Sequence, residues 1–583
     1  MAQEQIDSVL VLDCGLVMTK ALLFDRMGGE YRFVTSGEAP TTLAPPDSDV
    51  TTGIYRAVER ISGVTGRTFF DGDGDLISPQ VSDTQGVDAL TLTVSAADRL
   101  QLALSGLVPD LSLSSARRAA AGTYSEVRAV LGGEAVGISD EERVRVIRAT
   151  RPDVVLVTGG IDGGARRPVL DGAKAATLAC AMMDSEDRPT IVYAGNSQLR
   201  REITHIVGDE AELRVVDNVR PKLEDERIWG AQQELQSLFR HRKLDRVPGV
   251  GAPTRWSSVP VTATAHAFAL VVQYLWHLGD PSKGILGIDL GGGSTTVAAV
   301  FDGQLYLTID GGFGVASGGT RLLRSDGLDT LTRWIPSAVT RDEVEALLLN
   351  KRIHPASIPQ VDADLWVEQA LACEAVRRTV DLARPGWKRK ATGQTRGLTP
   401  LCDTILLTGA ALTRAPRPGQ AALLILNAVQ PIGVSTLVLD RHGLAPALGS
   451  VAALKPLVTV EALDAGGFTN LAIIVAPIGG EVQGGTVLRV DVLYENGRSL
   501  EVQVEHGDLE VLPLPLGEEA VLELHPSKGV DVGLGGPGRG GKRRVSGGLV
   551  GLIVDARGRP LVPVDSAEGQ HKNMQEWLYR VGG

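Results

Sequence analysis

The chain has 583 residues, 43% of them hydrophobic, and its formal net charge at pH 7 is −12. At roughly 150 residues per domain, a chain of this length builds about three or four domains with cores of their own. The negative charge argues against general binding to nucleic acid or to an anionic membrane, because both require a positive protein surface. Proteins and small molecules are therefore the expected partners.

The spacing of the cysteines and the distribution of apolar residues indicate the cellular compartment of the protein. The four cysteines are far apart and form no CxxC pair, so neither a zinc site nor a disulfide framework is indicated. The N-terminal stretch MAQEQIDSVLVLD carries acids before its apolar run, unlike a signal peptide. The most apolar long run, residues 421–439, is interrupted by Asn427, Gln430 and Pro431, so no membrane span is predicted. These features predict a cytoplasmic protein.

The first predicted element is a β-hairpin. The apolar run SVLVLDCG at 8–15 ends in a turn with Asp13 and Gly15, and TKALLFD then resumes a strand-like pattern. Such a turn can cradle phosphate oxygens with its backbone N–H groups, while the Asp can hold Mg²⁺ through water. Thr19 or Lys20 can also contact phosphate. Taken alone, the loop is weak evidence, because an Asp-x-Gly turn after a strand is more often an ordinary turn.

Strands and helices then alternate. The strand-like runs lie at 152–164 and 189–196, and the helical runs at 173–183, 198–208 and 224–243. This alternation predicts a parallel sheet covered by helices. The segment TGGIDGG at 158–164 places Asp162 among four glycines. It is either a further ligand loop or a tight connection after a strand.

A second hairpin, GILGIDLGGGS at 284–294 followed by TTVAAVFDG, repeats the pattern of the first and predicts an internal duplication. Three consecutive glycines cost backbone entropy and supply no side-chain packing, which favours phosphate binding. No Lys follows the glycines as in a Walker loop, and a strand follows instead of the helix of a dinucleotide fingerprint. The candidate binding residues here are Asp289, Gly291, Gly292, Gly293, Ser294 and Thr295.

The segment LLTGAAL at 406–412 ends a strand and begins a helix. Close approach to a helix N-terminus suits an adenosine or phosphate group. Gly409, Ala410 and Leu412 are therefore candidate nucleotide-binding residues, although an ordinary strand-to-helix turn is equally compatible with this pattern.

Beyond residue 460, strand-like segments follow one another with Gly and Asn turns, which predicts an antiparallel β domain. Its stretch GLGGPGRGGKRR at 533–544 is interpreted as a flexible basic surface loop, which either has no partner or docks an acidic partner or a cofactor phosphate. The predicted fold is α/β with an additional β domain. Residues 1–250 form a first lobe with an insertion, residues 251–458 a second lobe, and residues 459–583 the C-terminal β domain with the Gly-rich basic loop.

The three loops in this order resemble those of the actin, hexokinase and heat-shock-chaperone superfamily of ATPases. That resemblance implies two ribonuclease H-like lobes that close on Mg·ATP, with Asp13 and Asp289 near the metal and residues 409–412 near the nucleoside. A closer resemblance lies in APTTLAPPDSDVTTGIYRAVERI at 39–61, in VLVTGGIDGG followed by IVYAGN, and in NVRPKLEDERIWGAQQELQSLF at 218–239. These stretches are similar to the glutamate mutase accessory protein family, called GlmL or MutL and unrelated to mismatch repair.

Membership of that family implies an ATP-binding accessory protein or chaperone that assists or reactivates an adenosylcobalamin-dependent mutase. Two departures bear on catalysis. The adenosine motif has Ala410 where the pattern has Gly, and VPVTATAHAFAL at 259–270 lacks the carboxylate that orients the attacking water in chaperone-type ATPases. Slow hydrolysis and binding alone therefore both stay open, and no catalytic residue is assigned.

Two other functional classes fit the same loops. An actin-like assembly protein of the FtsA or PilM kind would use lobe insertions and the extra β domain for filament contacts. A small-molecule kinase would need a carboxylate base facing the γ-phosphate, and no such base can be placed in the sequence. The partner's identity and the oligomeric state do not follow from the sequence.

Overall fold

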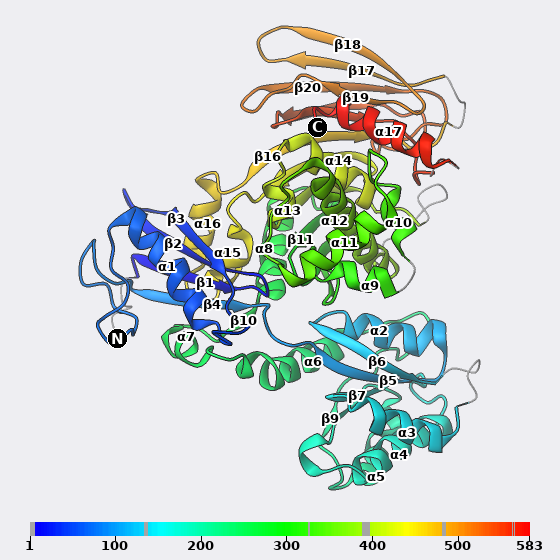
Figure 1. Ribbon diagram of the computed structural model, residues 1–583. Coiled ribbons are helices and arrows are strands. Elements are labelled where there is room, and N and C mark those ends of the chain that lie inside the picture. The colour runs from blue at the N-terminus through cyan, green and yellow to red at the C-terminus, as the bar shows by residue number, and fades with distance from the viewer. Residues whose placement is uncertain are drawn as a thin grey trace. The chain divides into compact units, whose positions relative to one another are not determined.

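The computed structural model describes residues 6–132, 138–324, 327–387, 397–480, 485–562, 564 and 566–583. Contacts divide the chain into two compact units. The first comprises Met1–Ser95, Ala252–Leu307 and Gly312–Gly583, and the second comprises Ala96–Gly251 with Thr308–Gly311. Each unit is described by itself (Figure 1).

The first unit begins with a sheet in the order β10-β4-β1-β2-β3. Strands β1, β2 and β3 form an antiparallel meander, while β4 runs parallel to β1 and β10 runs parallel to β4. The apolar run predicted as the first strand is almost wholly buried. The strands are β1 (Ser8–Cys14), β2 (Met18–Met27), β3 (Glu30–Pro40), β4 (Ala89–Val94) and β10 (Thr262–Ala263), and α1 (Thr51–Thr65) precedes β4.

A second sheet repeats this order as β13-β12-β11-β14-β15. Here too, β11 pairs antiparallel with β12 and parallel with β14, and β14 pairs parallel with β15. The internal duplication predicted from the two hairpins is thus confirmed as a repeat of topology. The strands are β11 (Gly284–Leu290), β12 (Thr295–Phe301), β13 (Gln304–Asp310), β14 (Cys402–Thr408) and β15 (Gly433–Leu439).

Helices cover this sheet and supply most of its core. Helix α8 (Thr264–Leu278) packs against α15 (Leu444–Ala452), and both contribute to a core cluster that includes residues of β1 and β11. The remaining helices of this region are α9 (Gly318–Arg324), α10 (Leu328–Thr332), α11 (Arg341–Ile353), α12 (Asp362–Ala383), α13 (Ala410–Thr413), α14 (Pro418–Val429) and α16 (Pro456–Asp464).

The segment predicted as the C-terminal β domain contributes to two sheets. Strands β16 (Thr469–Ala476), β22 (Gly551–Asp555) and β19 (Leu509–Leu512) extend the second sheet beyond β15. Strands β17 (Thr486–Tyr494), β18 (Ser499–Glu505), β20 (Glu519–Pro526) and β21 (Gly541–Ser546) form a separate antiparallel sheet in the order β18-β17-β20-β21. The expected antiparallel sheet is therefore present, whereas the proposed domain boundaries stay a prediction.

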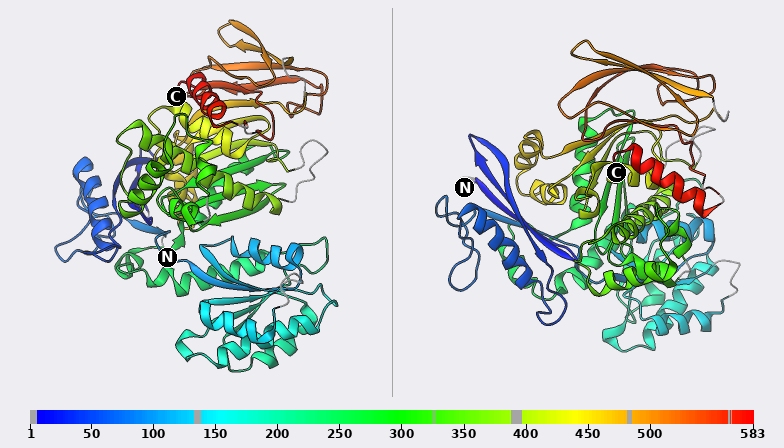
Figure 2. Two further views of the ribbon diagram at one scale, coloured as in Figure 1. Left: turned by 45° about the vertical axis from the view of Figure 1, so that its right-hand side comes forward. Right: turned by 45° about the horizontal axis from the view of Figure 1, so that its top comes forward.

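The stretch predicted as a flexible basic loop ends in strand β21, because residues 541–546 pair with β20. The three cations at its C-terminal end are matched by acidic side chains. Lys542 lies 3.1 Å from Glu523, and Arg543 lies 2.6 Å from Asp403. These pairs explain why the basic end of the segment is held in a sheet. Helix α17 (Ala567–Arg580) follows, and Figure 2 shows it in two further views.

The second unit has a parallel sheet in the order β6-β5-β7-β8-β9, as the alternation of strands and helices predicts. Helices α3, α4 and α5 pack on one face, and α2 and α6 contact β6 and β5. The strands are β5 (Leu100–Ser105), β6 (Ser125–Leu131), β7 (Val154–Val157), β8 (Thr190–Tyr193) and β9 (Leu213–Val215). The helices are α2 (Ser114–Ala120), α3 (Asp140–Thr150), α4 (Arg167–Ala181), α5 (Arg200–Val207) and α6 (Trp229–Arg242).

Candidate functional site

Asp13 is the first carboxylate of the candidate site and lies at the end of β1. One of its oxygens, Oδ1, accepts hydrogen bonds from the hydroxyls of Thr93 and Thr264, each at 2.8 Å. The parallel pairing of β1 with β4 places Thr93 directly opposite Asp13. Burial raises the pKa of Asp13, while the two hydroxyls and Lys20 oppose that rise. One oxygen of this carboxylate is therefore fixed by the fold.

Two carbonyl groups of the turn after β1 are engaged by Thr41. The N–H of Gly15 donates to the carbonyl of Met18 at 3.0 Å, which closes the turn. The carbonyls of Gly15 and Val17 accept from the hydroxyl and the N–H of Thr41 at 2.7 and 2.9 Å. With these carbonyls engaged, the exposed tip at Leu16 presents backbone N–H groups, which suit an anion.

The turn after β11 is built in the same way. The N–H of Gly291 donates to the carbonyl of Ser294 at 2.9 Å. The carbonyls of the three glycines accept hydrogen bonds from residues 315–317 at 2.8 to 3.2 Å. Within the described part of the chain, the N–H groups of Gly292 and Gly293 donate to no acceptor. The loop thus offers donors and no carbonyl acceptor of its own, as a phosphate cradle requires.

The two turns lie against one another, and this direct contact adds to the shared metal site that the family resemblance implies. A β-carbon on Gly292 would collide with Val17, and one on Gly293 would collide with Leu16. Neither glycine has a positive φ. The structure therefore supplies a packing reason for these glycines in addition to the expected ligand contact, since only glycine lets the two loops approach so closely.

Asp289 occupies the position in the second hairpin that Asp13 occupies in the first. Burial raises the pKa of Asp289 to about 7, and the carboxylates of Asp13 and Asp440 add to this rise, while Lys20 opposes it. Two strand ends that are 276 positions apart in the sequence are thus brought into electrostatic contact. The result is a partly buried cluster of carboxylates with Lys20 among them.

Asp440 is a member of this cluster that the sequence analysis missed. It directly follows β15 and accepts the backbone N–H groups of Leu444 and Ala445 at 2.7 and 2.8 Å, which caps helix α15. Burial raises its pKa, and those N–H groups and Lys20 oppose the rise. A signal was available, because STLVLD at 435–440 is an apolar strand ending in Asp, as in both hairpins.

The remaining predicted residues of the two loops divide into a cation and two structural threonines. Lys20 lies 3.6 Å from Glu38 and contributes to the field at all three aspartates. The Thr19 hydroxyl is buried and bonded to Thr41 at 2.9 Å. The Thr295 hydroxyl is buried and donates to the carbonyl of Phe313 at 2.7 Å. Their hydroxyls therefore hold the loops in shape.

The third predicted element, at the start of α13, is joined to the second loop. Gly409 has a φ of 102°, and a β-carbon there would fall onto the carbonyl oxygen of Leu290, the residue before Gly291. Ala410 is exposed at the helix start, whereas Leu412 is buried in the core. The backbone around residues 409 and 410 can therefore contact a ligand, whereas the side chain of Leu412 packs into the core.

The donor set fits a hydrated divalent cation. Within the described ranges, no group of three or more His, Cys, Asp and Glu side chains is arranged to hold a metal ion directly. Mg²⁺ keeps most of its waters and needs only one or two carboxylates. Asp13 and Asp289 supply these in a site where their mutual repulsion already raises the pKa of Asp289.

The raised pKa of Asp289 predicts a pH effect in the metal-free protein. Its folded value of about 7 exceeds the ordinary 3.8, so the contribution to stability is full below about pH 4 and is lost as pH rises through 7. In EDTA, the unfolding temperature should fall between pH 5 and pH 8 more steeply for the wild type than for Asp289→Asn. Identical pH profiles of the two proteins would contradict this electrostatic account.

The glycine-rich segment 158–164 of the second unit is tied down by its neighbours. The carboxylate of Asp162 accepts the N–H of Ser197 and the side-chain amide of Asn218, both at 2.9 Å. Its own N–H donates to the carbonyl of Pro221 at 3.0 Å. These bonds favour the tight connection over the ligand loop.

Comparison with known proteins decides the family. The match to the family described as MutL protein spans residues 9–465, which includes all three loops. The chain belongs to the MutL protein family. It is similar to Protein MutL of Clostridium tetanomorphum, with 24% identity over 387 residues that cover 63% of this chain and 76% of that protein.

Solved structures also resemble the chain at a distance. Nucleotide-free acetone carboxylase shares 13% identity with a TM-score of 0.35, covering 88% of this chain and 82% of that one. Xylulose kinase from Bifidobacterium adolescentis shares 12% identity with a TM-score of 0.27, covering 80% of this chain and 96% of that one.

The duplicated strand order described above and membership of the MutL family support a nucleotide-binding accessory role. No helix in the described ranges is long and apolar enough to cross a membrane.

Proposed function

We propose that the chain binds Mg·ATP between the two hairpin loops of its first unit and acts as a cytoplasmic accessory protein of an adenosylcobalamin-dependent mutase. The observation that carries the proposal is the pairing of Asp13 and Asp289 at equivalent ends of two duplicated hairpins. The MutL relationship supports the choice of a mutase partner. A role in assisting or reactivating that enzyme follows from the family resemblance.

Each loop has a stated task in this proposal. The N–H groups of Gly292 and Gly293 bind phosphate oxygens, and Lys20 adds a positive charge. Asp13 and Asp289 hold Mg²⁺ through its waters, and the ion neutralises phosphate charge when bound. The exposed backbone at Ala410 contacts the nucleoside.

Slow hydrolysis or binding alone fits the surroundings of the site. At the start of α8, Thr264 hydrogen-bonds Asp13, in the region where chaperone-type ATPases carry a water-orienting carboxylate. The carboxylate of Asp440 already accepts two backbone N–H groups at the N-terminus of α15. With these groups engaged, the exchange of ATP for ADP is the step we expect to change affinity for the partner.

A binding experiment with the mutase tests the proposal. The affinity of the full chain for the purified mutase should differ by at least roughly fivefold between saturating Mg·ATP and Mg·ADP, which corresponds to a coupling of about 1 kcal/mol. The Asp289→Asn variant should bind the mutase with the same affinity in Mg·ATP as in Mg·ADP. Equal affinities for the wild type would contradict the accessory role, and filaments seen by negative stain with ATP would favour the assembly alternative.

A further inference from the structure

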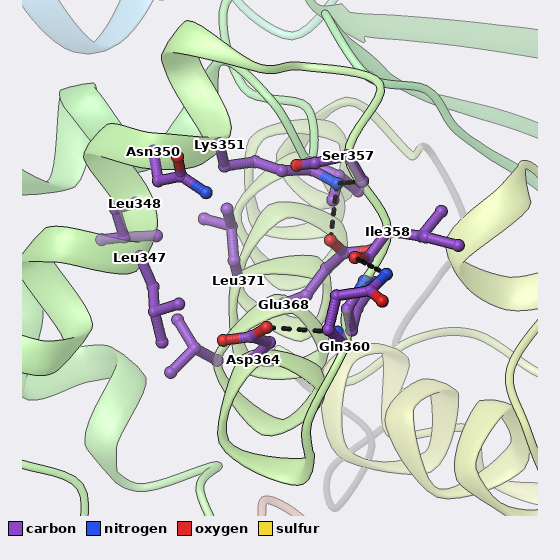
Figure 3. Close-up of a pocket in the computed structure, with 13 residues that line it drawn as sticks. Leu347, Leu348, Asn350, Lys351, Ser357, Ile358, Gln360, Asp364, Glu368 and Leu371 are labelled. Atoms are coloured by element: carbon purple, nitrogen blue, oxygen red, sulfur yellow. Dashed lines mark hydrogen bonds and ion pairs between the residues drawn. The ribbon is translucent and has the colours of Figure 1, made fainter.

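A cavity of about 140 Å³ lies between α11 and α12 in the first unit, under the loop that joins the two helices (Figure 3). Its volume corresponds to roughly five water molecules at about 30 Å³ each. Aliphatic side chains form much of its lining, namely Val315, Leu347, Leu348, Val367 and Leu371. Figure 3 shows the three leucines together and polar groups around the other sides. The cavity therefore suits a compact ligand with an apolar part.

The polar wall carries one negative charge in excess. Lys351 Nζ lies 2.6 Å from Glu368 Oε2 and also donates to the carbonyl of Ser357. Asp364 Oδ2 accepts the N–H of Gln360 at 3.2 Å. Glu368 is thus neutralised by Lys351, whereas Asp364 has no cation beside it in the described part of the chain. Such a wall attracts a cationic group and disfavours a ligand that carries negative charge alone.

The two carboxylates come from successive turns of α12. Asp364 and Glu368 are four residues apart on α12, so they lie on the same face of that helix. Asp364 Oδ1 and Glu368 Oε1 accept no hydrogen bond from the described residues. An ammonium group has three donors and no acceptor, which matches two open carboxylate oxygens beside an apolar floor.

We propose that this cavity binds a small alkylammonium compound, a short branched aliphatic amine or an aliphatic amino acid. The ammonium group bonds Asp364 and Glu368, and the alkyl part packs on Leu347 and Leu371. The cavity also borders the candidate phosphate loop, because Val315 in its lining donates its N–H to the carbonyl of Gly291 at 3.0 Å. A ligand here is an effector placed next to that loop.

Calorimetric titration of the full chain without nucleotide tests the site apart from the proposed function. The probes are 3-methylbutylamine, L-leucine and the carboxylate 4-methylpentanoate. Saturable binding of the amine, of leucine or of both is expected at millimolar concentration or below, and their relative affinities distinguish an amine from an amino acid as the source. The carboxylate should not bind.

Two variants assign the binding to the cavity. Asp364→Asn should weaken binding by about tenfold or more, because it removes a charged acceptor. Asp362→Asn is the matched control, since Asp362 is exposed on the same helix and does not line the cavity. Leu347→Phe should fill the cavity and abolish binding even if the charge variant folds poorly. Failure of both ammonium probes, equal binding of the carboxylate, or unchanged affinity in both cavity variants would overturn the proposal.

Discussion

Replacing Asp289 by Asn is expected to weaken Mg·ATP binding by at least roughly 100-fold, which is equivalent to about 3 kcal/mol. The substitution keeps the shape of the side chain but removes one of the two carboxylates that hold the hydrated ion. It also relieves the repulsion that raises the pKa of Asp289, so the protein itself should stay folded. The dissociation constants are measured by isothermal titration at fixed free Mg²⁺.

Asp302→Asn is the matched control for this variant. Asp302 is exposed in the turn between β12 and β13 and has a φ of 50°, a conformation that Asn also adopts readily. Its affinity for Mg·ATP should equal that of the wild type. If Asp289→Asn also binds with wild-type affinity, the metal is held elsewhere.

Replacing Gly409 by Ala should destabilise the first unit by about 3 kcal/mol or more. A methyl group there meets the carbonyl oxygen of Leu290, and the φ of 102° is strained for any residue with a β-carbon. The oxygen belongs to the backbone of Leu290 and the methyl carbon is bonded directly to the Cα of residue 409, so neither can move without disturbing β11 and the loop that follows it. The midpoint of urea unfolding measures the effect.

The control variant Gly466→Ala separates the cost of backbone strain at a positive φ from the cost of the steric collision. Gly466 has a comparable φ of 89°, but a β-carbon there meets nothing within 4 Å. The control should therefore lose only the strain component, of order 1 kcal/mol. Equal losses in the two variants would show that the approach of Gly409 to Leu290 carries no energetic weight.

The duplicated part of the fold could be predicted because its signal is local. Each hairpin consists of an apolar strand, an Asp, a glycine turn and a second strand, and the same spacing yields the same register in both sheets. The juxtaposition of Asp13 with Asp289 followed from the family resemblance. Its electrostatic consequence, a raised pKa, required the structure.

Contacts between distant segments could not be predicted in this way. The hydroxyl of Thr264 reaches Asp13 across 251 positions, because β10, directly before Thr264, pairs with β4, which in turn pairs with β1. The collision partners of Gly292 and Gly293 likewise come from the other hairpin. Asp440 differs from these, since its strand-end pattern was readable and was overlooked.

In the C-terminal segment, the sequence likewise predicts that strands form but not which sheet each strand joins. Alternating strands with glycine turns predict antiparallel pairing, and β17, β18, β20 and β21 provide it. The pattern does not say that β16 pairs with β15, because that ladder joins segments on opposite sides of the proposed boundary at residue 459. Pairing between strands on opposite sides of such a boundary depends on the burial of whole sheet faces, which a local pattern does not contain.

The central claim is that this chain binds Mg·ATP, and isothermal titration of the full wild-type chain with ATP tests it most directly. In the presence of free Mg²⁺ we predict saturable binding of one ATP per chain, weakened at least about tenfold when EDTA replaces Mg²⁺. No saturable binding up to millimolar ATP, or equal affinity with and without Mg²⁺, would contradict the account.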